Sequence, residues 1–265
     1  MNDCGMRGWD PDAYLRFDRE RTRPAVDLVA RIELSEPVRI IDLGCGPGNS
    51  TRILAERWPG SAVRGLDSSE EMLRRAREDH PGLEWVHGRA EDLGFGSGYS
   101  LVFSNAALQW MGDHGTLVPR LWGTVGEGGA FAAQIPAFER MPFLDAAREV
   151  MGGGRWRGRV RRDFWEEKKL NPIGFYYDLL APLAAEVVLW ETRYIHVLDS
   201  AEAVMAFLRT AALKPYLDQL EDGAERGMFE ADVLEACRKR YPARGDGKVL
   251  FPFERQFIIA YRGRS

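Results

Sequence analysis

Cysteine is scarce in this chain, and its spacing excludes two kinds of protein. Among 265 residues there are only three cysteines, Cys4, Cys45 and Cys237. An odd number at such long intervals fits neither a disulfide framework nor a zinc site built from CxxC pairs. We therefore expect a reducing, cytoplasmic setting and no metal centre.

Long apolar runs and an excess of basic residues are also missing. The uncharged residues 93–112 include four glycines together with Asn105 and Gln109, so they do not predict a membrane span. No apolar signal segment is recognisable near the N-terminus. Lysine and arginine number 36 against 40 acidic residues, a net charge of −4, which offers no chain-wide basic field for nucleic acid. We expect neither membrane nor nucleic-acid partners, and nothing here predicts an oligomeric state.

What is present is a regular alternation of strand-like and helix-like segments. Short β-branched or apolar runs predict strands, and stretches with helical spacing follow most of them. Strands are predicted over residues 38–42, 62–66, 83–87, 99–104, 130–135, 186–196 and 256–261, and helices over 49–58, 69–78 and 114–124. The alternation predicts an α/β fold, a doubly wound, mostly parallel, seven-stranded Rossmann-like sheet with helices on both faces.

This rhythm breaks after Pro136. Residues 140–182 carry a run of three glycines, several prolines and five arginines between Arg155 and Arg162, which together predict an inserted lid. The arginines either recruit an anion or form a solvated surface. Residues 200–241 show helical apolar spacing. We expect a sheet domain of residues 1–136, 186–198 and 249–265, and a helical cap of residues 137–185 and 199–248.

The sharpest motif lies where the first predicted strand ends, and it reads DLGCGPGNS over residues 42–50. Alternating glycines let the backbone approach a ligand closely at the start of a helix. The spacing is GxGxG rather than the GxGxxG of dinucleotide-binding proteins. Since Asp42 would repel a phosphate and attract an ammonium group, the motif favours S-adenosylmethionine over a pyrophosphate.

A second acid, Asp67, ends the next predicted strand. A carboxylate there can accept hydrogen bonds from both hydroxyls of a ribose. Dinucleotides and S-adenosylmethionine share this device, but a dehydrogenase would need a third glycine at Asn49, where none stands. An unoccupied βα loop is the alternative for the glycine turn, and Asp67 argues against it.

Several segments together carry a resemblance to a known family. DLGCGPGNST (42–51), LDSSEEM (66–72) and SNAALQW (104–110) resemble class I S-adenosylmethionine-dependent methyltransferases, most closely the trans-aconitate 2-methyltransferases. The resemblance extends over nearly the whole chain through WDPDAYLRF (9–17), FYYDLL (175–180), LKPYL (213–217) and FIIA (257–260). The glycine motif alone indicates a methyltransferase, and the NAALQW and N-terminal segments narrow the choice.

The resemblance implies a binding mode for S-adenosylmethionine. Gly44 and Gly46 would lie against its methionine end, and Asp67 would hold the ribose. The backbone carbonyl of Asn105 would accept from the methionine ammonium group, and other side chains would flank the adenine. The implied cofactor residues are Asp42, Gly44, Gly46, Asn49, Asp67, Ser68, Met72, Arg89, Ala90 and Asn105.

One position departs from the family pattern. After the third strand the family usually has an aspartate that accepts from the adenine amino group, and here that position is Arg89. Arginine has no acceptor. The adenine would instead use the backbone of Ala90, or Glu91 or Asp92 after a small shift of the loop, so the change bears on cofactor affinity.

The implied reaction is methylation of a carboxylate. A carboxylate oxygen of trans-aconitate would attack the sulfonium methyl group, giving a monomethyl ester and S-adenosylhomocysteine. Because a carboxylate is already ionised at pH 7, no general base is required. Donors and aromatic walls for this acceptor are expected among Trp9, Tyr14, Arg21, Gln109, Trp110, His114, Tyr176, Tyr177, Tyr194, His196 and Arg255.

Several of these residues also have a purely structural interpretation. His114 stands at a predicted helix start, and His196 shares one strand face with Tyr194, so either histidine can be a packing residue. At Arg255, an ion pair with Glu254 competes with a substrate contact.

Two other functions remain open at this stage. If His114 or His196 acted as a base, the protein could methylate a hydroxyl group of another small metabolite. A histidine base would add a limb near its pKa of about 6.5 to the pH profile, which separates this function from carboxyl methylation. Arg89 at the adenine position is also compatible with a non-catalytic S-adenosylmethionine-binding regulator.

Overall fold

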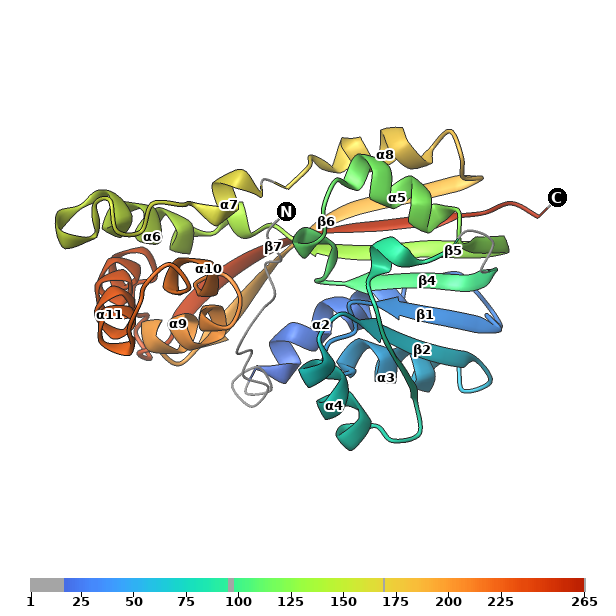
Figure 1. The fold of residues 1–265 in the computed structure, drawn as a ribbon, viewed down its shortest axis with the longest axis horizontal. Helices are drawn as coiled ribbons and strands as arrows, with labels where there is room; N and C mark the ends of the chain where they lie inside the picture. Colours follow the sequence, from blue (N-terminus) through green and yellow to red (C-terminus); the bar gives the residue numbers. More distant parts are fainter. Residues whose placement is uncertain (1–16, 95–97, 169, 265) are drawn as a thin grey trace.

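A seven-stranded sheet forms the centre of the protein. The computed structural model describes residues 17–94, 98–168 and 170–264. Within these ranges the strand order is β3-β2-β1-β4-β5-β7-β6 (Figure 1). The strands are β1 (Arg39–Leu43), β2 (Ala62–Asp67), β3 (Glu84–His87), β4 (Tyr99–Asn105), β5 (Val125–Pro136), β6 (Glu186–Leu198) and β7 (Val249–Tyr261).

The predicted doubly wound, mostly parallel sheet is confirmed. β1 pairs in parallel with β2 and β4, and the parallel part continues to β3 and β5. β7 is antiparallel to both β5 and β6. Ile40, Ile41 and Leu43 of β1 are almost completely buried, as expected for a strand that is covered on both faces.

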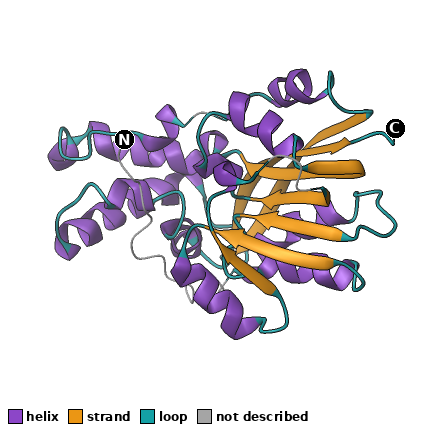
Figure 2. Ribbon diagram, turned by 45° about the vertical axis from the view of Figure 1, so that its right-hand side comes forward, coloured by secondary structure: helices purple, strands orange, loops and turns teal. Residues whose placement is uncertain are grey.

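Helices cover both faces of this sheet (Figures 1 and 2). One face packs against α2 (Asp18–Val29) and α3 (Asn49–Arg57), which contribute Leu28 and Leu54 to its core. The other face packs against α5 (His114–Trp122) and α8 (Ile173–Leu180). α4 (Glu70–Asp79) lies beside β2 and β3. None of these or the other described helices is long and apolar enough to cross a membrane.

A helical cap with its own core lies beside the sheet (Figure 1). β6 and β7 pair along their full length and run from the sheet into the cap. Phe257 near one end belongs to the sheet core, whereas Phe251 and Phe253 belong to the cap core. The cap helices are α6 (Pro142–Gly152), α7 (Phe164–Glu167), α9 (Ala201–Arg209), α10 (Lys214–Leu217) and α11 (Gly223–Arg240).

Two details differ from the sequence-based expectation. α8 falls inside the expected cap segment 137–185 but packs on the sheet, because Tyr176 and Leu180 are buried with α5 and strand residues. β5 and β7 begin several residues earlier than predicted. The glycines early in β5 and Pro252 in β7 obscured the strand pattern in these stretches.

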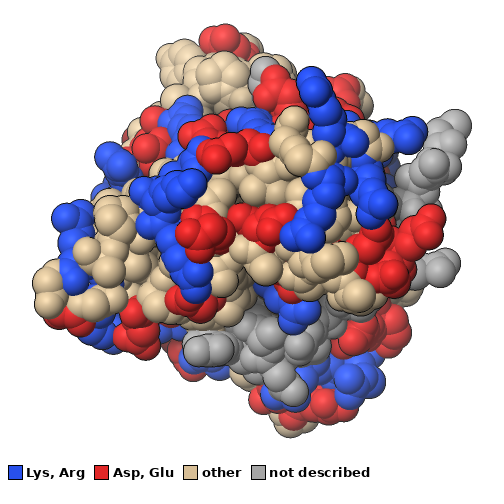
Figure 3. All heavy atoms as spheres, turned by 90° about the vertical axis from the view of Figure 1, so that its left-hand side faces the viewer, with Lys and Arg blue, Asp and Glu red and all other residues tan. Residues whose placement is uncertain are grey.

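The arginine-rich segment 155–162 belongs to the surface of the cap. Arg155 pairs with Asp232 of α11 (Nη2–Oδ2 2.9 Å), and Arg159 contacts Glu225 of the same helix. Basic and acidic side chains intermingle on this side of the molecule (Figure 3). These ion pairs favour the interpretation as a solvated surface over recruitment of an anion.

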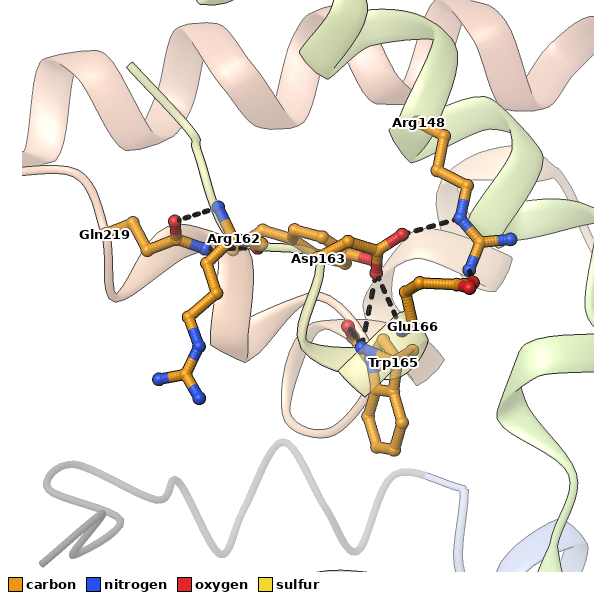
Figure 4. A network of polar contacts seen from close by, with 8 residues as sticks. Arg148, Arg162, Asp163, Trp165, Glu166 and Gln219 are labelled. Atoms are coloured by element: carbon orange, nitrogen blue, oxygen red, sulfur yellow. Dashed lines mark hydrogen bonds and ion pairs between the residues drawn. The ribbon is translucent and has the colours of Figure 1, made fainter. Parts of the chain in front are cut away.

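Asp163 ties this segment to the neighbouring helices (Figure 4). Its carboxylate accepts hydrogen bonds from Arg148 Nε (2.6 Å), from the hydroxyl of Tyr216 (2.8 Å) and from the amide N–H of Trp165 (3.2 Å). The contacts with Arg148 and Tyr216 hold the pKa of Asp163 below its usual value against the opposing effect of burial. The cap is therefore a packed unit rather than a loose lid.

Candidate active site

The glycine turn lies between the carboxyl ends of β1 and β4. Gly44 has φ +67°, and a Cβ there would stand 2.3 Å from the Cβ of Ala107, so only glycine allows the two segments to approach. Gly46 has φ +55°, and a Cβ there would point into open space. The turn therefore presents an open backbone surface at the strand ends, which is where ligands bind in open α/β sheets.

Asp67 borders this turn. Its Oδ2 accepts the amide N–H of Gly46 (2.8 Å), and its Oδ1 accepts that of Ser69 (2.8 Å). Burial raises the pKa of Asp67, and the backbone hydrogen bonds oppose that rise. Each carboxylate oxygen has a second lone pair, so the group can still accept two hydroxyl donors.

Asp42 is placed differently from the sequence-based expectation. Its carboxylate is completely buried, and Oδ2 accepts hydrogen bonds from Ser50 Oγ (2.6 Å) and Thr51 Oγ1 (2.7 Å). Burial raises its pKa to about 7. Asp42 thus fixes the first turn of α3 against β1, and its direct contact with a ligand ammonium group stays a prediction.

The turn after β4 carries backbone strain. Ala106 adopts φ +53°, a conformation that costs energy for a residue with a Cβ and that recurs at functional sites. Nε2 of Gln109 donates to the carbonyl oxygen of Ala106 (2.6 Å). Since that carbonyl can only accept, the Gln109 amide orientation is fixed, and its Oε1 is buried with no partner in the part of the chain that the structure describes. Oδ1 of Asn105 is likewise buried, and none of the residues in 17–94, 98–168 and 170–264 bonds it.

His114 is bonded at both ring nitrogens. Nε2 lies 2.8 Å from the carbonyl oxygen of Leu108, to which it must donate, and Nδ1 lies 2.7 Å from the hydroxyl of Tyr176. Burial lowers the pKa of His114, which favours the neutral ring. Because both ring nitrogens are hydrogen-bonded to described residues, the structure favours a packing role for His114, and its role as a base stays a prediction. Tyr176 is fully buried and serves the same contact, so it is not a free substrate donor.

A second group of predicted residues gathers where α2 and α9 meet the sheet. Arg21 Nη2 donates to the carbonyl oxygen of Phe207 (2.7 Å). The ring of His196 stacks on that of Tyr194 (centroids 6.0 Å apart), and the Tyr194 hydroxyl bonds Asp27 (2.6 Å). Burial, with help from nearby arginines, lowers the pKa of His196 to about 4.

Arg255 lies at the edge of this second group. Its guanidinium stands 4.2 Å from the ring centre of Phe253, and its Nη1 donates to Oε1 of Gln134 (3.2 Å). Gln134 escaped the sequence analysis, although a polar residue inside the apolar run AFAAQIP was a usable signal. The rings of Trp110, Phe138 and Phe253 form a chain between the two groups, with centroids 6.2 and 5.5 Å apart.

With this geometry in place, comparison with known proteins identifies the family. Residues 40–129 match the model of a methyltransferase domain. A trans-aconitate 2-methyltransferase of Paracidovorax citrulli is 41% identical over 261 residues, covering 97% of this chain and 99% of the relative. One of Azoarcus sp. is 41% identical over 263 residues, with 97% and 100% covered. The chain belongs to the trans-aconitate 2-methyltransferase family.

Solved structures share the fold of this methyltransferase at low sequence identity. The YcgJ protein of Bacillus subtilis aligns with a TM-score of 0.56 and 11% identity, covering 92% of this chain and 99% of its own. A Haemonchus contortus phosphoethanolamine N-methyltransferase 2, solved with S-adenosyl-L-methionine, aligns with a TM-score of 0.58 and 14% identity, covering 96% and 56%. At such identities the likeness concerns the fold alone.

The remaining predicted cofactor residues of the methyltransferase differ in their exposure to solvent. Asn49 is half-buried at the start of α3, and Ser68 is exposed. Met72 is buried against the cap core. Arg89 is exposed and pairs with Glu91 (Nη2–Oε1 3.2 Å), while Ala90 is buried at the start of the short helix η1 (Ala90–Asp92).

One cavity of about 350 Å³ opens beside the turn after β4. Gln109, Phe138 and Trp165 are among its lining residues. The charged residues of its lining that the structure describes are three acids and one base, Asp113, Glu139, Glu167 and Lys168. Acids therefore outnumber bases among the described residues that line this cavity.

The last predicted substrate residues fall outside the site or outside the described ranges. Tyr177 is 51% exposed on α8, and its role as a substrate contact stays a prediction. Trp9 and Tyr14 lie outside the described residues. Among the described residues, no group of three His, Cys, Asp or Glu side chains could hold a metal ion.

Proposed function

We propose that this protein transfers the methyl group of S-adenosyl-L-methionine to a carboxylate of trans-aconitate, with release of the monomethyl ester and S-adenosyl-L-homocysteine. The names of the curated relatives support the substrate. The single observation that favours a carboxylate over a hydroxyl acceptor is the state of His114, whose two ring nitrogens are both bonded within the protein.

The residues around the glycine turn fit S-adenosylmethionine by their hydrogen-bonding character. Asp67 can accept from a ribose diol, and the unpartnered oxygens of Asn105 and Gln109 suit an ammonium group, which only donates. A diphosphate, which only accepts, would find no complement in these oxygens. When bound, S-adenosylmethionine supplies an electrophilic methyl group. Gly44, Gly46, Asn49, Asp67, Ser68, Met72, Ala90 and Asn105 are the residues that we expect to hold it.

The chain's own residues then act by positioning and by excluding water. Carboxylates are ionised at pH 7, so the acceptor needs no proton removed. Both ring nitrogens of His114 are hydrogen-bonded within the protein, and burial favours its neutral form. His196, with a pKa near 4, is too weakly basic to activate a hydroxyl group. Orientation of two reactants can contribute about 7–11 kcal/mol to catalysis. The aromatic rings of Trp110, Phe138 and Phe253 provide a dry wall for this reaction.

Product analysis tests the proposal directly. The protein is incubated with methyl-labelled S-adenosylmethionine and trans-aconitate, and the acids are analysed by mass spectrometry. We expect a labelled monomethyl ester. A labelled hydroxyl ether from another metabolite, or cofactor binding without transfer to any acid, would contradict the proposal.

The pH dependence of the rate gives an independent measure. We expect kcat/KM for trans-aconitate to stay flat above about pH 6, because the carboxylates are fully ionised there. A limb with a midpoint near pH 6.5 would indicate a histidine base and an O-methyltransferase for hydroxyl groups. We place the reaction in the cytoplasm, which the two buried free thiols of Cys45 and Cys237 support.

A further inference from the structure

A line of polar side chains crosses the sheet on one face, next to the turn after β4. Asn105 on β4 and Gln134 on β5 are register partners, and the amide N–H of Ala106 donates to the carbonyl oxygen of Gln134 (3.0 Å). Arg255 on β7 continues the line through its contact with Gln134. Gln134 therefore stands between the residues expected at the methionine end of the cofactor and a buried guanidinium.

The orientation of the Gln134 amide is fixed by its neighbour. Guanidinium nitrogens only donate, so the oxygen of the Gln134 amide must face Arg255, as the 3.2 Å contact shows. Nε2 therefore points away from Arg255. It is buried and has no hydrogen-bond partner among the described residues, and the Gln134 side chain is 0% exposed. A buried unpaired donor is costly, and a ligand acceptor would remove that cost.

The surroundings add further donors and positive charge. Arg255 is 4% exposed and lies over the ring of Phe253. Nε2 of His196, on the neighbouring strand, is also buried without a partner among the described residues, and it donates in the tautomer that carries the proton on Nε2. Glu254 faces away, where its carboxylate pairs with Arg140 (3.1 Å). The site thus offers donors, which suit a carboxylate group because an ionised carboxylate only accepts.

We propose that Gln134 and Arg255 form a carboxylate subsite, which holds an acceptor carboxylate other than the one that is methylated, and that Gln134 determines the preference for tricarboxylates. This inference rests on the proposed function for the identity of the acceptor. The adjacency of Gln134 to Asn105 places the subsite beside the expected methyl donor.

Calorimetry on the protein loaded with S-adenosylhomocysteine tests the subsite without requiring turnover. The probes are tricarballylate, which has three carboxylates, and glutarate and methylsuccinate, each of which lacks a different one of them. Gln134→Leu is expected to weaken tricarballylate binding about tenfold or more, since a hydrogen bond to a charged group is lost. At least one dicarboxylate is expected to change less than threefold, because it lacks the carboxylate held by the subsite.

Two further variants guard against a trivial loss of structure. Gln134→Glu keeps an oxygen for Arg255 but replaces the donor with an acceptor, so it should weaken tricarballylate at least as much as Gln134→Leu. Gln256→Leu is the matched control, because Gln256 is equally buried on the same sheet but faces the opposite side, where it bonds Glu191 (3.0 Å). Its tricarballylate affinity should stay within threefold of the unchanged protein.

The outcomes separate the subsite from the proposed function. Unchanged tricarballylate binding in both Gln134 variants, or an equal loss for all three acids, would overturn the subsite even if trans-aconitate is methylated. Selective loss of tricarballylate binding in a protein that methylates no acid would support the subsite and contradict the proposed function. In an active protein, Gln134→Leu should raise KM for trans-aconitate about tenfold and leave kcat within threefold.

Discussion

Single polar side chains at the carboxyl ends of the strands define the candidate active site. Asp67 bonds the backbone of the glycine turn, and Gln109 holds the strained Ala106. Asp42, by contrast, is committed to the first turn of α3. Asp67 and Asp42, on adjacent strands, therefore have different roles, because Asp67 is half-buried at the turn whereas Asp42 is completely buried.

Replacing Asp67 tests the ligand role of the glycine turn. Asp67→Ala removes a carboxylate that is placed to accept two ribose hydroxyls, and each lost hydrogen bond to a charged group is worth roughly 1.5–3 kcal/mol. We expect the Kd for S-adenosylhomocysteine, measured by calorimetry, to rise more than tenfold. Asp79→Ala at the far end of α4, where Asp79 pairs with Arg75 (2.7 Å), serves as the control. Unchanged affinity in Asp67→Ala would place the ribose elsewhere.

Helices α5 and α8 are joined by the contact between His114 and Tyr176. The same histidine holds the carbonyl of Leu108, in the short helix η2 (Leu108–Trp110). Two hydrogen bonds of His114 thus connect α8 and α5 to the turn after β4. His114 therefore has a structural role in positioning this turn.

Tyr176→Phe tests the hydrogen bond between Tyr176 and His114. The variant loses one buried hydrogen bond, so we expect the free energy of unfolding in urea to fall by about 1–2 kcal/mol. The pH dependence of kcat/KM should keep its shape, because the proposed carboxylate acceptor needs no base. Tyr177→Phe, on the exposed side of the same helix, should change neither quantity. A new or shifted limb in the Tyr176→Phe profile would restore His114 as a proton acceptor.

The sheet and the cap share two continuous strands, which makes them parts of one structure. Phe253 of β7 contacts the rings of Phe138, Phe207 and Phe251. It therefore connects the cap core with the edge of the active site. Since β6 and β7 run through both parts, the cap cannot unfold without disturbing the sheet. We therefore expect a single cooperative unfolding transition.

Phe253→Ala tests this coupling. Removal of a buried phenylalanine side chain costs about 3–5 kcal/mol, and here the loss should lower the stability of sheet and cap together. Circular dichroism and tryptophan fluorescence are expected to report coincident urea transitions with a lower midpoint. Ile195→Ala, at a site on β6 that is 49% exposed, should shift the midpoint little. Two separate transitions would show that the cap folds independently.

The sequence by itself predicted the local structure around the glycine turn. The strand that ends at Leu43, the glycine turn and α3 were predictable, because alternating glycines after a β-branched run have few other structural solutions. Asp67 beside the turn followed from strand alternation, since parallel strands end at one edge. The family resemblance was visible in the same motifs, and the curated relatives bear it out.

Only the tertiary structure decided which groups remain available to a ligand. His114 meets Tyr176 across 62 positions, and Arg255 meets Gln134 across 121. No periodic pattern in the sequence predicts either contact, because each depends on how distant strands and helices pack together. Burial depends on the same long-range packing. Asp42 is completely buried, and α8 packs on the sheet rather than in the expected cap. Residue types thus indicated the chemistry, whereas long-range packing selected the atoms that can perform it.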